Sequence, residues 1–456
     1  MKEIVAVLRI LPLFLFIILA FQPFSALAVE GLAEESQADI ENESGLFYVV
    51  PNDFATAQNY SYEKVDRHAL EAPASAEESI ESLAAYLIEP AKNDREKARA
   101  IFRWICENID YDVDVFFSGK TGPTDSVDLL KSKKSICFGY SDLFLSLASE
   151  AGLEAVRISG YGKGYGYMPG TSFSGPTNHA WNAVKINGSW YLLDCTWGAG
   201  YANSDKEYVR HFDDHFFMTP PSEFVFNHFP VDEIWQLLDH PISLEEYEGL
   251  VYLDSDFFNL GLRLDGQKNG TVEARGEVNI SIYAPEDVLM MVGLDYADSS
   301  TSARENLDGY ALCQRAGERY DLLAKPPLVG SYILKAYGKK KTDPGDYNSV
   351  LKYRIEADSA DDGSSGYPTT YSKFDEAGAY LMSPLEGKLL AGKSYWFGIL
   401  VPGAEDVAVV CGKEWTHLAK NGDLFEGNAT AEKGDVGLYA NFGGGKWDGM
   451  VGYACR

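Results

Sequence analysis

The chain has 456 residues, which is too long for one hydrophobic core and suits two to four domains, with three as the expected number. Its formal net charge of −29 argues against nucleic acid as a partner, because phosphate binding requires positive side chains. Six cysteines without a CxxC pair exclude zinc ribbons and disulfide-rich scaffolds.

The first 28 residues have the pattern of a secretory signal peptide. Lys2 and Arg9 precede an apolar run at residues 11–21, and Ala26-Leu27-Ala28 forms a cleavage site. The run is shorter than the ~20 residues that a membrane-spanning helix needs. We therefore expect cleavage, export to the cell envelope or beyond, and no stable membrane insertion afterwards. Residues 29–45 are acidic and predict a flexible segment.

Residues 46–250 are expected to form one α+β domain. Apolar side chains at helical spacing predict a helix over residues 94–108 and a second over 135–152, where Gly152 provides the C-terminal cap. Cys137 then lies in the first turn of the second helix. A strand at 153–159, a glycine-tyrosine loop and two alternating runs joined by Asn187-Gly188 follow. A helix followed by antiparallel strands is an α+β layout.

Beyond residue 250 the pattern changes to short strands separated by turn residues. Residues 330–336 are echoed by residues 434–440, which indicates an internal repeat. We predict two β-sandwich domains, at 251–358 and 367–456. Cys411 and Cys455 share the second of these domains, so we predict a disulfide between them.

The Asn187-Gly188 turn fixes the register of its hairpin. A two-residue loop places Ile186 opposite Ser189, and by the same register Trp181 opposite Asp194. His179 then lies diagonal to Asp194 on one face, at roughly 7 to 8 Å between backbones, within reach of an imidazole and a carboxylate. Cys195 is expected on the opposite face, packed away.

Cys137, His179 and Asp194 together predict acyl-transfer chemistry. A thiol in a first helical turn is expected to have a lowered pKa, because the helix dipole favours the thiolate. The thiolate attacks a carbonyl, His179 moves the proton, and Asp194 holds the imidazole in the useful tautomer. The backbone N–H of Cys137 is the expected oxyanion donor. Singly, each of these residue types is more often structural; the joint arrangement carries the prediction.

Aromatic side chains and histidines near the predicted site are candidates for binding a substrate or a metal. Tyr161, Tyr165 and Tyr167 of the glycine-tyrosine loop, with Trp181, are expected to contact a peptide substrate. The loop itself, residues 160–164, is interpreted as flexible, since no helix follows to bind a phosphate. His211 and His215 could ligate zinc only with a helix and a third ligand, so no metal or cofactor is predicted, and His228 is interpreted as structural.

Several segments have the pattern of a known family. They are Cys137-Phe138-Gly139-Tyr140, Asn178-His179-Ala180-Trp181-Asn182-Ala183-Val184, Trp190-Tyr191-Leu192-Leu193-Asp194, Thr196-Trp197-Gly198-Ala199-Gly200 and His228-Phe229-Pro230. Over residues 80–250 the chain resembles the transglutaminase-like core and, more narrowly, the kyphoscoliosis peptidase group. This resemblance implies a papain-like α+β fold with the three residues in the roles above, followed by immunoglobulin-like domains. Cys195 departs from the small residue expected there.

The leading hypothesis from the sequence is an exported cysteine peptidase or amidase that acts on peptide or protein substrates. One alternative keeps the same site and makes it a protein-glutamine transglutaminase, in which an amine competes with water at the thioester. The other treats the chain as a non-catalytic surface scaffold or binding protein whose β domains hold a partner.

Overall fold

A computed structural model describes residues 60–120, 125–298, 307–359 and 366–456. The predicted signal peptide and the acidic segment at 29–45 lie outside these residues. In the described part of the chain, every helix is too short or too polar to cross a bilayer.

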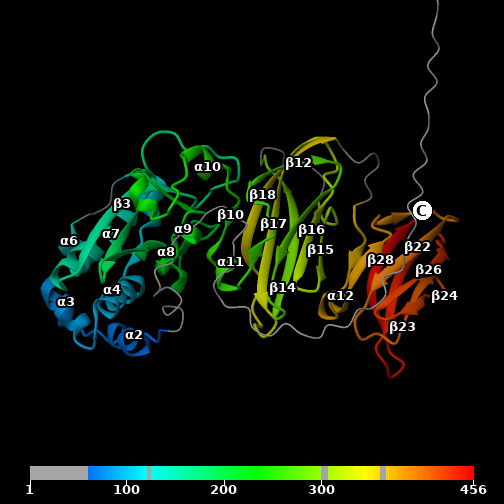
Figure 1. Cartoon of the computed structure of the whole chain (residues 1–456), viewed down its shortest axis with the longest axis horizontal. Coiled ribbons are helices and arrows are strands. Elements are labelled where there is room, and N and C mark those ends of the chain that lie inside the picture. Colours follow the sequence, from blue (N-terminus) through cyan, green and yellow to red (C-terminus); the bar gives the residue numbers. More distant parts are fainter. Residues whose placement is uncertain (1–59, 121–124, 299–306, 360–365) are drawn as a thin grey trace, which may run out of the picture. The chain divides into compact units, whose positions relative to one another are not determined.

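The first domain begins with helices. They are α2 (Glu63–Leu70), α3 (Ile80–Ile88), α4 (Asp94–Asn108), α5 (Val113–Ser118), α6 (Ser126–Ser132) and α7 (Cys137–Glu150). The predicted helix at 94–108 is confirmed, and Asn93 caps it by accepting the backbone N–H of Glu96. In Figure 1, α3, α4 and α6 gather at one side of this domain.

The helices pack on a five-stranded antiparallel sheet. Its order is β8 (Phe217–Thr219), β5 (Ser189–Leu193), β4 (His179–Ile186), β3 (Glu154–Gly162) and β9 (His228–Pro230). One core fills the space between them, with Trp104, Tyr140, Phe144 and Trp181 at most 1% exposed. At about 25 cal/mol per Å² of apolar surface, such burial is the main force that holds α7 against β3 and β4.

The hairpin of β4 and β5 has the predicted register. Ile186 pairs with Ser189 and Asn182 with Leu193, while Asn187 and Gly188 take positive φ values of 51° and 87°, as a primed turn requires. The pairing ends at Leu193, so the predicted continuation of the strand through Asp194 and Cys195 is wrong. The chain turns there into the short helix α8 (Cys195–Ala199), and Asp194 caps that helix.

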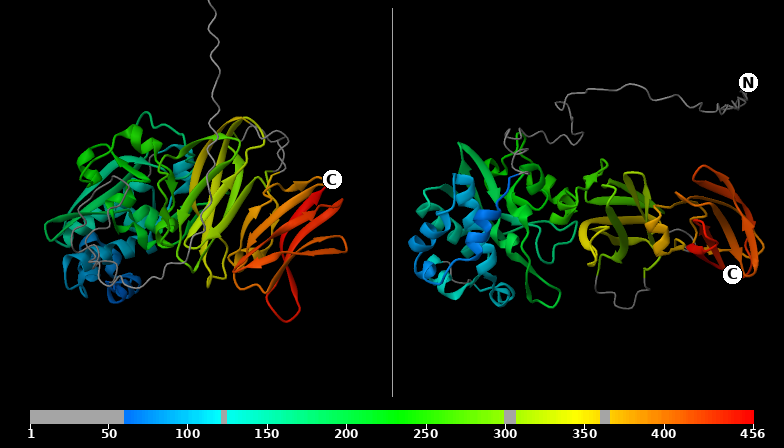
Figure 2. Two further views of the ribbon diagram at one scale, coloured as in Figure 1. Left: turned by 45° about the vertical axis from the view of Figure 1, so that its right-hand side comes forward. Right: turned by 90° about the horizontal axis from the view of Figure 1, so that it is seen from below.

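From β10 onward the chain forms two β-sandwiches, as predicted, accompanied by the short helices α11 (Ser255–Asn259) and α12 (Ser372–Glu376). In the first, β10 (Tyr252–Leu253), β18 (Asn348–Ser359), β17 (Gly330–Lys340) and β14 (Val288–Tyr296) face β11 (Arg263–Leu264), β13 (Val278–Tyr283), β16 (Arg319–Ala324) and β15 (Ala311–Ala316). Strand β12 (Thr271–Arg275) joins the first sheet beside β18. Figure 2 shows these layers from two further directions.

The second sandwich repeats the plan of the first. One sheet contains β19 (Thr369–Thr370), β28 (Trp447–Cys455), β27 (Gly434–Asn441), β23 (Asp406–Cys411) and β24 (Glu414–His417), with β21 (Lys388–Leu389) beside β28. The other contains β20 (Tyr380–Ser383), β22 (Ser394–Leu400), β26 (Leu424–Thr430) and β25 (Ala419–Asn421). The repeated sequence segments occupy β17 and β27, each paired between two neighbours.

The predicted disulfide between Cys411 and Cys455 is wrong. Both thiols are free, because β27 lies between the strands that carry them. Strands one place removed are about 9 to 10 Å apart, beyond the usual reach of a disulfide.

Candidate active site

Cys137 sits where a short strand turns into a helix. Strand β2 (Lys134–Ser135) pairs in parallel with β1 (Asp110–Tyr111), and α7 begins two residues later. A Cβ on Gly139 would lie 2.1 Å from the Ser135 hydroxyl, so only glycine permits this tight turn. The first N–H groups of α7 receive no side-chain cap, which leaves the backbone at Cys137 free to bind an oxyanion.

His179 is the first residue of β4 and its ring is held on two sides. The indole of Trp197 stacks on the imidazole at 4.9 Å between ring centroids. A Cβ on Gly162 of the neighbouring strand would lie 3.1 Å from the Cβ of His179 and 3.2 Å from its ring. The absence of a side chain at Gly162 therefore sets the position of the imidazole.

Asp194 has two functions at the start of α8. Its Oδ1 accepts the backbone N–H groups of Thr196 at 2.7 Å and Trp197 at 3.2 Å. Its Oδ2 lies 2.7 Å from Nε2 of His179. The helix cap thus fixes the carboxylate that anchors the imidazole, and the predicted contact between His179 and Asp194 is confirmed.

The thiol of Cys137 completes the arrangement. Because Nε2 of His179 is committed to Asp194, Nδ1 is the ring nitrogen left for Cys137, which lies close enough to raise the pKa of this histidine. Tyr111 reports the same proximity, since burial and then the charges of Cys137 and Asp194 raise the pKa of its phenol. Cys137 and His179 are each 5% exposed and Asp194 is fully buried.

The electrostatics favour a charged imidazole. Burial alone would lower the pKa of His179, but the Asp194 carboxylate and the Cys137 thiol outweigh it and raise this pKa to about 10. Burial would raise the pKa of Asp194, yet the two imidazoles beside it hold this pKa well below its usual range. At neutral pH the pair is therefore an imidazolium and a carboxylate.

His228 is the residue that the sequence analysis missed. Interpreted there as structural, it places its Nε2 at 3.1 Å from Oδ2 of Asp194, the same oxygen that His179 uses. It comes from β9, whose pairing with β3 sets His228 opposite Gly162. The segment His228-Phe229-Pro230 was the sequence signal available, since it is one of those that resemble the family, but the position of β9 in the sheet was not predicted.

The predicted substrate-binding side chains do not share one environment. Tyr165 is 47% exposed, whereas Tyr167 is 7% exposed with its ring parallel to that of Phe173. Tyr161 is half-buried and donates its hydroxyl to the carbonyl of Gly175. Trp181 is 1% exposed in the core, so its ring cannot contact a substrate directly. Of the four, Tyr165 offers the largest surface to a ligand.

The expected flexible loop is partly wrong. Residues 160–162 continue β3, and Lys163 is fully buried with Nζ donating to the carbonyls of Tyr247 at 2.7 Å and Leu250 at 3.0 Å. Burial lowers the pKa of Lys163 to about 7. These bonds hold the segment in place.

The described residues include one group of potential metal ligands. Among them, His179, Asp194 and His228 form the group whose potential ligand atoms lie within 4.8 Å of one another. The polar atoms of this group already have hydrogen-bond partners in one another, because both imidazoles lie at hydrogen-bond distance from one oxygen of Asp194. His211 is exposed and His215 packs parallel to the ring of Phe258, so neither joins the group.

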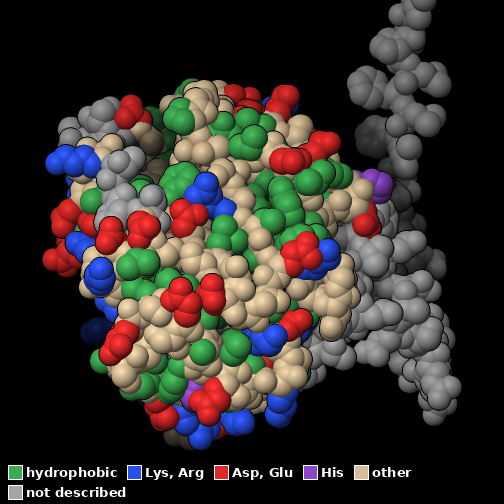
Figure 3. Space-filling view, turned by 90° about the vertical axis from the view of Figure 1, so that its left-hand side faces the viewer, with side chains coloured by type: hydrophobic (Ala, Val, Ile, Leu, Met, Phe, Trp, Pro, Cys, Tyr) green, Lys and Arg blue, Asp and Glu red, His purple; other side chains and the backbone are tan. Residues whose placement is uncertain are grey.

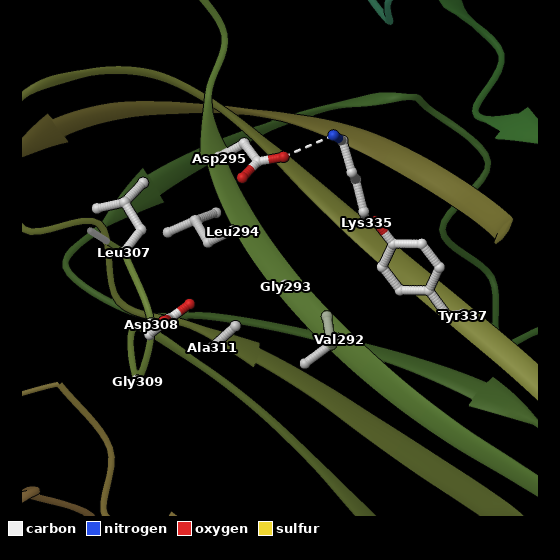
Figure 4. Close-up of a pocket in the computed structure, with 10 residues that line it drawn as sticks. All are labelled: Val292, Gly293, Leu294, Asp295, Leu307, Asp308, Gly309, Ala311, Lys335 and Tyr337. Carbon is white, nitrogen blue, oxygen red and sulfur yellow. Dashed lines mark ion pairs between the residues drawn. The ribbon is translucent and has the colours of Figure 1, made fainter. Parts of the chain in front are cut away.

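A cavity of about 180 Å³ lies in the first sandwich (Figure 4). Asp295 and Lys335 point toward one another at one end of it and form an ion pair of 2.5 Å. Its lining contains no cysteine or histidine. The lining residues are Val292, Gly293, Leu294, Asp295, Leu307, Asp308, Gly309, Ala311, Lys335 and Tyr337.

Fold and sequence together define the class of protein. Residues 81–195 match the model of the transglutaminase-like superfamily, and residues 244–368 match the KY-like, immunoglobulin-like domain. The chain therefore carries a transglutaminase-like domain followed by an immunoglobulin-like region.

The same combination makes the chain similar to named relatives. Kyphoscoliosis peptidase of Homo sapiens is 32% identical over 306 residues, which are 66% of this chain and 44% of that protein. Hillarin of Drosophila melanogaster is 31% identical over 324 residues, 64% of this chain and 39% of that protein. Lim and transglutaminase domain protein ltd-1 of Caenorhabditis elegans is 33% identical over 325 residues, which are 65% of this chain and 44% of that protein. The matched regions span less than half of each relative.

Proposed function

We propose that the protein is a cysteine peptidase or amidase that cleaves peptide or protein substrates through Cys137, His179 and Asp194. The observation that carries this proposal is the 2.7 Å contact between His179 and Asp194, with Cys137 close enough to the same imidazole to raise its pKa. Membership of the transglutaminase-like superfamily supports acyl-transfer chemistry at this position.

The reaction proceeds in two steps. The Cys137 sulfur attacks the carbonyl carbon, the carbon–nitrogen bond breaks, and the leaving amine takes the proton from Nδ1 of His179. Water then attacks the thioester and gives one proton to His179, and the acid leaves as the thiolate re-forms. The raised pKa of His179 supports this order, because the imidazole already holds the proton that the leaving amine needs.

Aromatic side chains suit the binding of a peptide. Tyr165 lies 5.1 Å from the ring of Phe117 and 6.4 Å from that of Phe116, and Phe116 lies 5.7 Å from Tyr111 beside the site. None of the α5 residues is buried, so this helix offers its two phenylalanines to a ligand. We propose that the cluster of Tyr111, Phe116, Phe117 and Tyr165 binds an apolar side chain of the substrate.

Export to the cell envelope or beyond remains part of the proposal. It rests on the N-terminal sequence pattern described above. The face that Figure 3 turns to the viewer mixes acidic, basic and apolar side chains, which suits a protein kept soluble by its charge.

Labelling of the thiol tests the proposal. Iodoacetamide is the suitable probe, because it is small and Cys137 is only 5% exposed. The reduced protein should be alkylated at Cys137, as located by mass spectrometry, and should release a stoichiometric burst of nitrophenolate from a p-nitrophenyl ester. Cys137→Ala should abolish both signals. Cys106→Ala, which removes another buried thiol, should keep both; a burst of unchanged size in Cys137→Ala would refute the assignment.

Cross-linking is the second candidate, and the match to the transglutaminase-like model favours it. It needs an amine to replace water at the thioester. A glutamine-containing peptide and a fluorescent primary amine separate the two reactions. Incorporation of the amine supports cross-linking, whereas free glutamate or a cleaved peptide supports hydrolysis.

A further inference from the structure

His228 is built into the site as firmly as His179. Its ring is 1% exposed and stacks on Phe224 at 3.8 Å between centroids. Nε2 lies 3.1 Å from Oδ2 of Asp194, and Nδ1 lies 2.7 Å from Oδ1 of Asn227. Both ring nitrogens thus have a partner inside the protein.

The protonation of His228 follows from these partners. A carboxylate has no proton to give, so Nε2 of His228 must carry the hydrogen that Asp194 accepts. Burial lowers the pKa of His228 to about 4, which favours a neutral ring. In the structure Asn227 turns Oδ1 toward Nδ1; a neutral ring with its proton on Nε2 would be matched by the NH₂ group of the same amide after a rotation of 180°.

Asp194 consequently accepts four hydrogen bonds. Oδ1 takes two backbone N–H groups at the start of α8, and Oδ2 takes one N–H from each imidazole. A carboxylate with this many donors is strongly held in its ionised form. His179 alone would supply only three of these four donors.

We infer that His228 is a positioning residue that shares Oδ2 of Asp194 with His179 and keeps this carboxylate ionised and aimed at the imidazole. This inference rests on the proposed function for its catalytic meaning, but the hydrogen bond itself does not. His228 bonds to Asp194 and acts on the site through this carboxylate. The site therefore has a fourth member, 34 residues beyond Asp194 in the chain.

The charged and titratable groups around His228 define the test. Asp194 and His179 face it from the start of α8 and from β4, and His215 acts on it from the short helix Asp214–Phe216. Glu223 lies 3.8 Å from His215 in the helix Pro221–Phe224. His215 is a matched control, because its pKa is also lowered to about 4 by burial while it makes no contact with Asp194.

The experiment compares acid unfolding of the full chain and its variants, followed by circular dichroism. His228→Phe keeps a ring against Phe224 and removes the donor, whereas His228→Gln restores an N–H donor. His215→Phe removes an equally neutral buried histidine, so it cancels the contribution of histidine titration. We expect the acid midpoint of His228→Phe to lie about one pH unit above that of His215→Phe, because a hydrogen bond to a charged group corresponds to roughly one to two pKa units. His228→Gln should lie near the wild type.

Alkylation of Cys137 by iodoacetamide, followed from pH 4 to 8, gives the catalytic readout. The acid limb of the profile of alkylation rate against pH should shift to higher pH in His228→Phe. It should stay at the wild-type position in His215→Phe and in His228→Gln. Equal acid midpoints for the two phenylalanine variants would overturn the inference. So would a stoichiometric metal ion in the purified protein, because it would replace the shared protons. Failure of alkylation in the wild type would instead refute the proposed function and leave the unfolding comparison to decide on His228.

Discussion

Asp194→Asn isolates the charge of the site from its shape. Asparagine caps a helix as well as aspartate does, so Oδ1 should keep the two N–H groups at the start of α8. Nδ2 replaces Oδ2 and becomes a donor that faces the Nε2 atoms of His179 and His228. Both rings must then present a lone pair at Nε2, which moves the proton of His179 to Nδ1. A neutral ring in that tautomer cannot accept a proton from Cys137.

The size of the effect follows from the proton affinity of His179. With Asp194 ionised its pKa is about 10, and the Asp194 carboxylate makes the largest of the contributions that raise it above the ordinary 6.5. A difference of about 3.5 pKa units corresponds to a factor of roughly 3,000 in the stability of the imidazolium. Reaction through an imidazolium–thiolate pair should therefore slow by up to about 3,000-fold at pH 7, in line with the roughly 10⁴-fold loss for a triad with the wrong tautomer.

The assay is the second-order rate of alkylation of Cys137 by iodoacetamide at pH 7, with thermal unfolding as the check on folding. Asp213→Asn serves as the control, because Asp213 also caps a short helix through its carboxylate but lies outside the triad. We expect the control to react at the wild-type rate. Alkylation of Asp194→Asn within twofold of that rate would refute the electrostatic argument, since it would mean that the carboxylate does not govern the thiol.

Three further predictions concern stability and positioning. Folded His179 keeps its proton up to about pH 10. Its contribution of up to about 5 kcal/mol to the free energy of unfolding is therefore complete below pH 6.5 and is lost as pH rises through 10. Urea unfolding of His179→Gln should lack this loss of stability at high pH. Lys163 has the opposite sign, since its pKa is lowered to about 7, and Lys163→Met should lack the rise in stability between pH 7 and 10.5. Gly162→Ala presses a methyl group on the His179 ring and should slow alkylation of Cys137 by about tenfold, as expected of a small misplacement of a catalytic group, with little change in melting temperature.

Local rules predicted the parts of the site that lie close together in the sequence. The Asn187-Gly188 turn fixes the register of β4 and β5, and register alone brings His179 near Asp194. The helical spacing after residue 135 likewise places Cys137 in a first turn. The same rules failed beyond Leu193, because the predicted strand was extended into residues that start α8. The signal against a strand was Asp194, a residue type that often caps a helix, followed by Cys195 and Thr196.

Long-range pairing could not be predicted in this way. His228 reaches Asp194 only because β9 pairs with the end of β3, and nothing near His228 in the sequence specifies that neighbour. The burial of Lys163 has the same origin, since its acceptors are the carbonyls of Tyr247 and Leu250. Such contacts depend on the path of the chain after the hairpin, which turn and periodicity rules do not determine.

The charges of the site largely balance one another. Imidazolium and carboxylate neutralise one another, so a thiolate at Cys137 would leave one net negative charge in a region that water barely enters. The start of α7 offsets this charge, because a helix N-terminus carries about half a positive charge and unpaired N–H groups. The neutral donor at His228 lowers the cost at Asp194 without adding a cation that would repel His179. Since the three groups are at most 5% exposed, dissolved salt screens their interactions little, and the reactivity of Cys137 should depend on pH far more than on ionic strength.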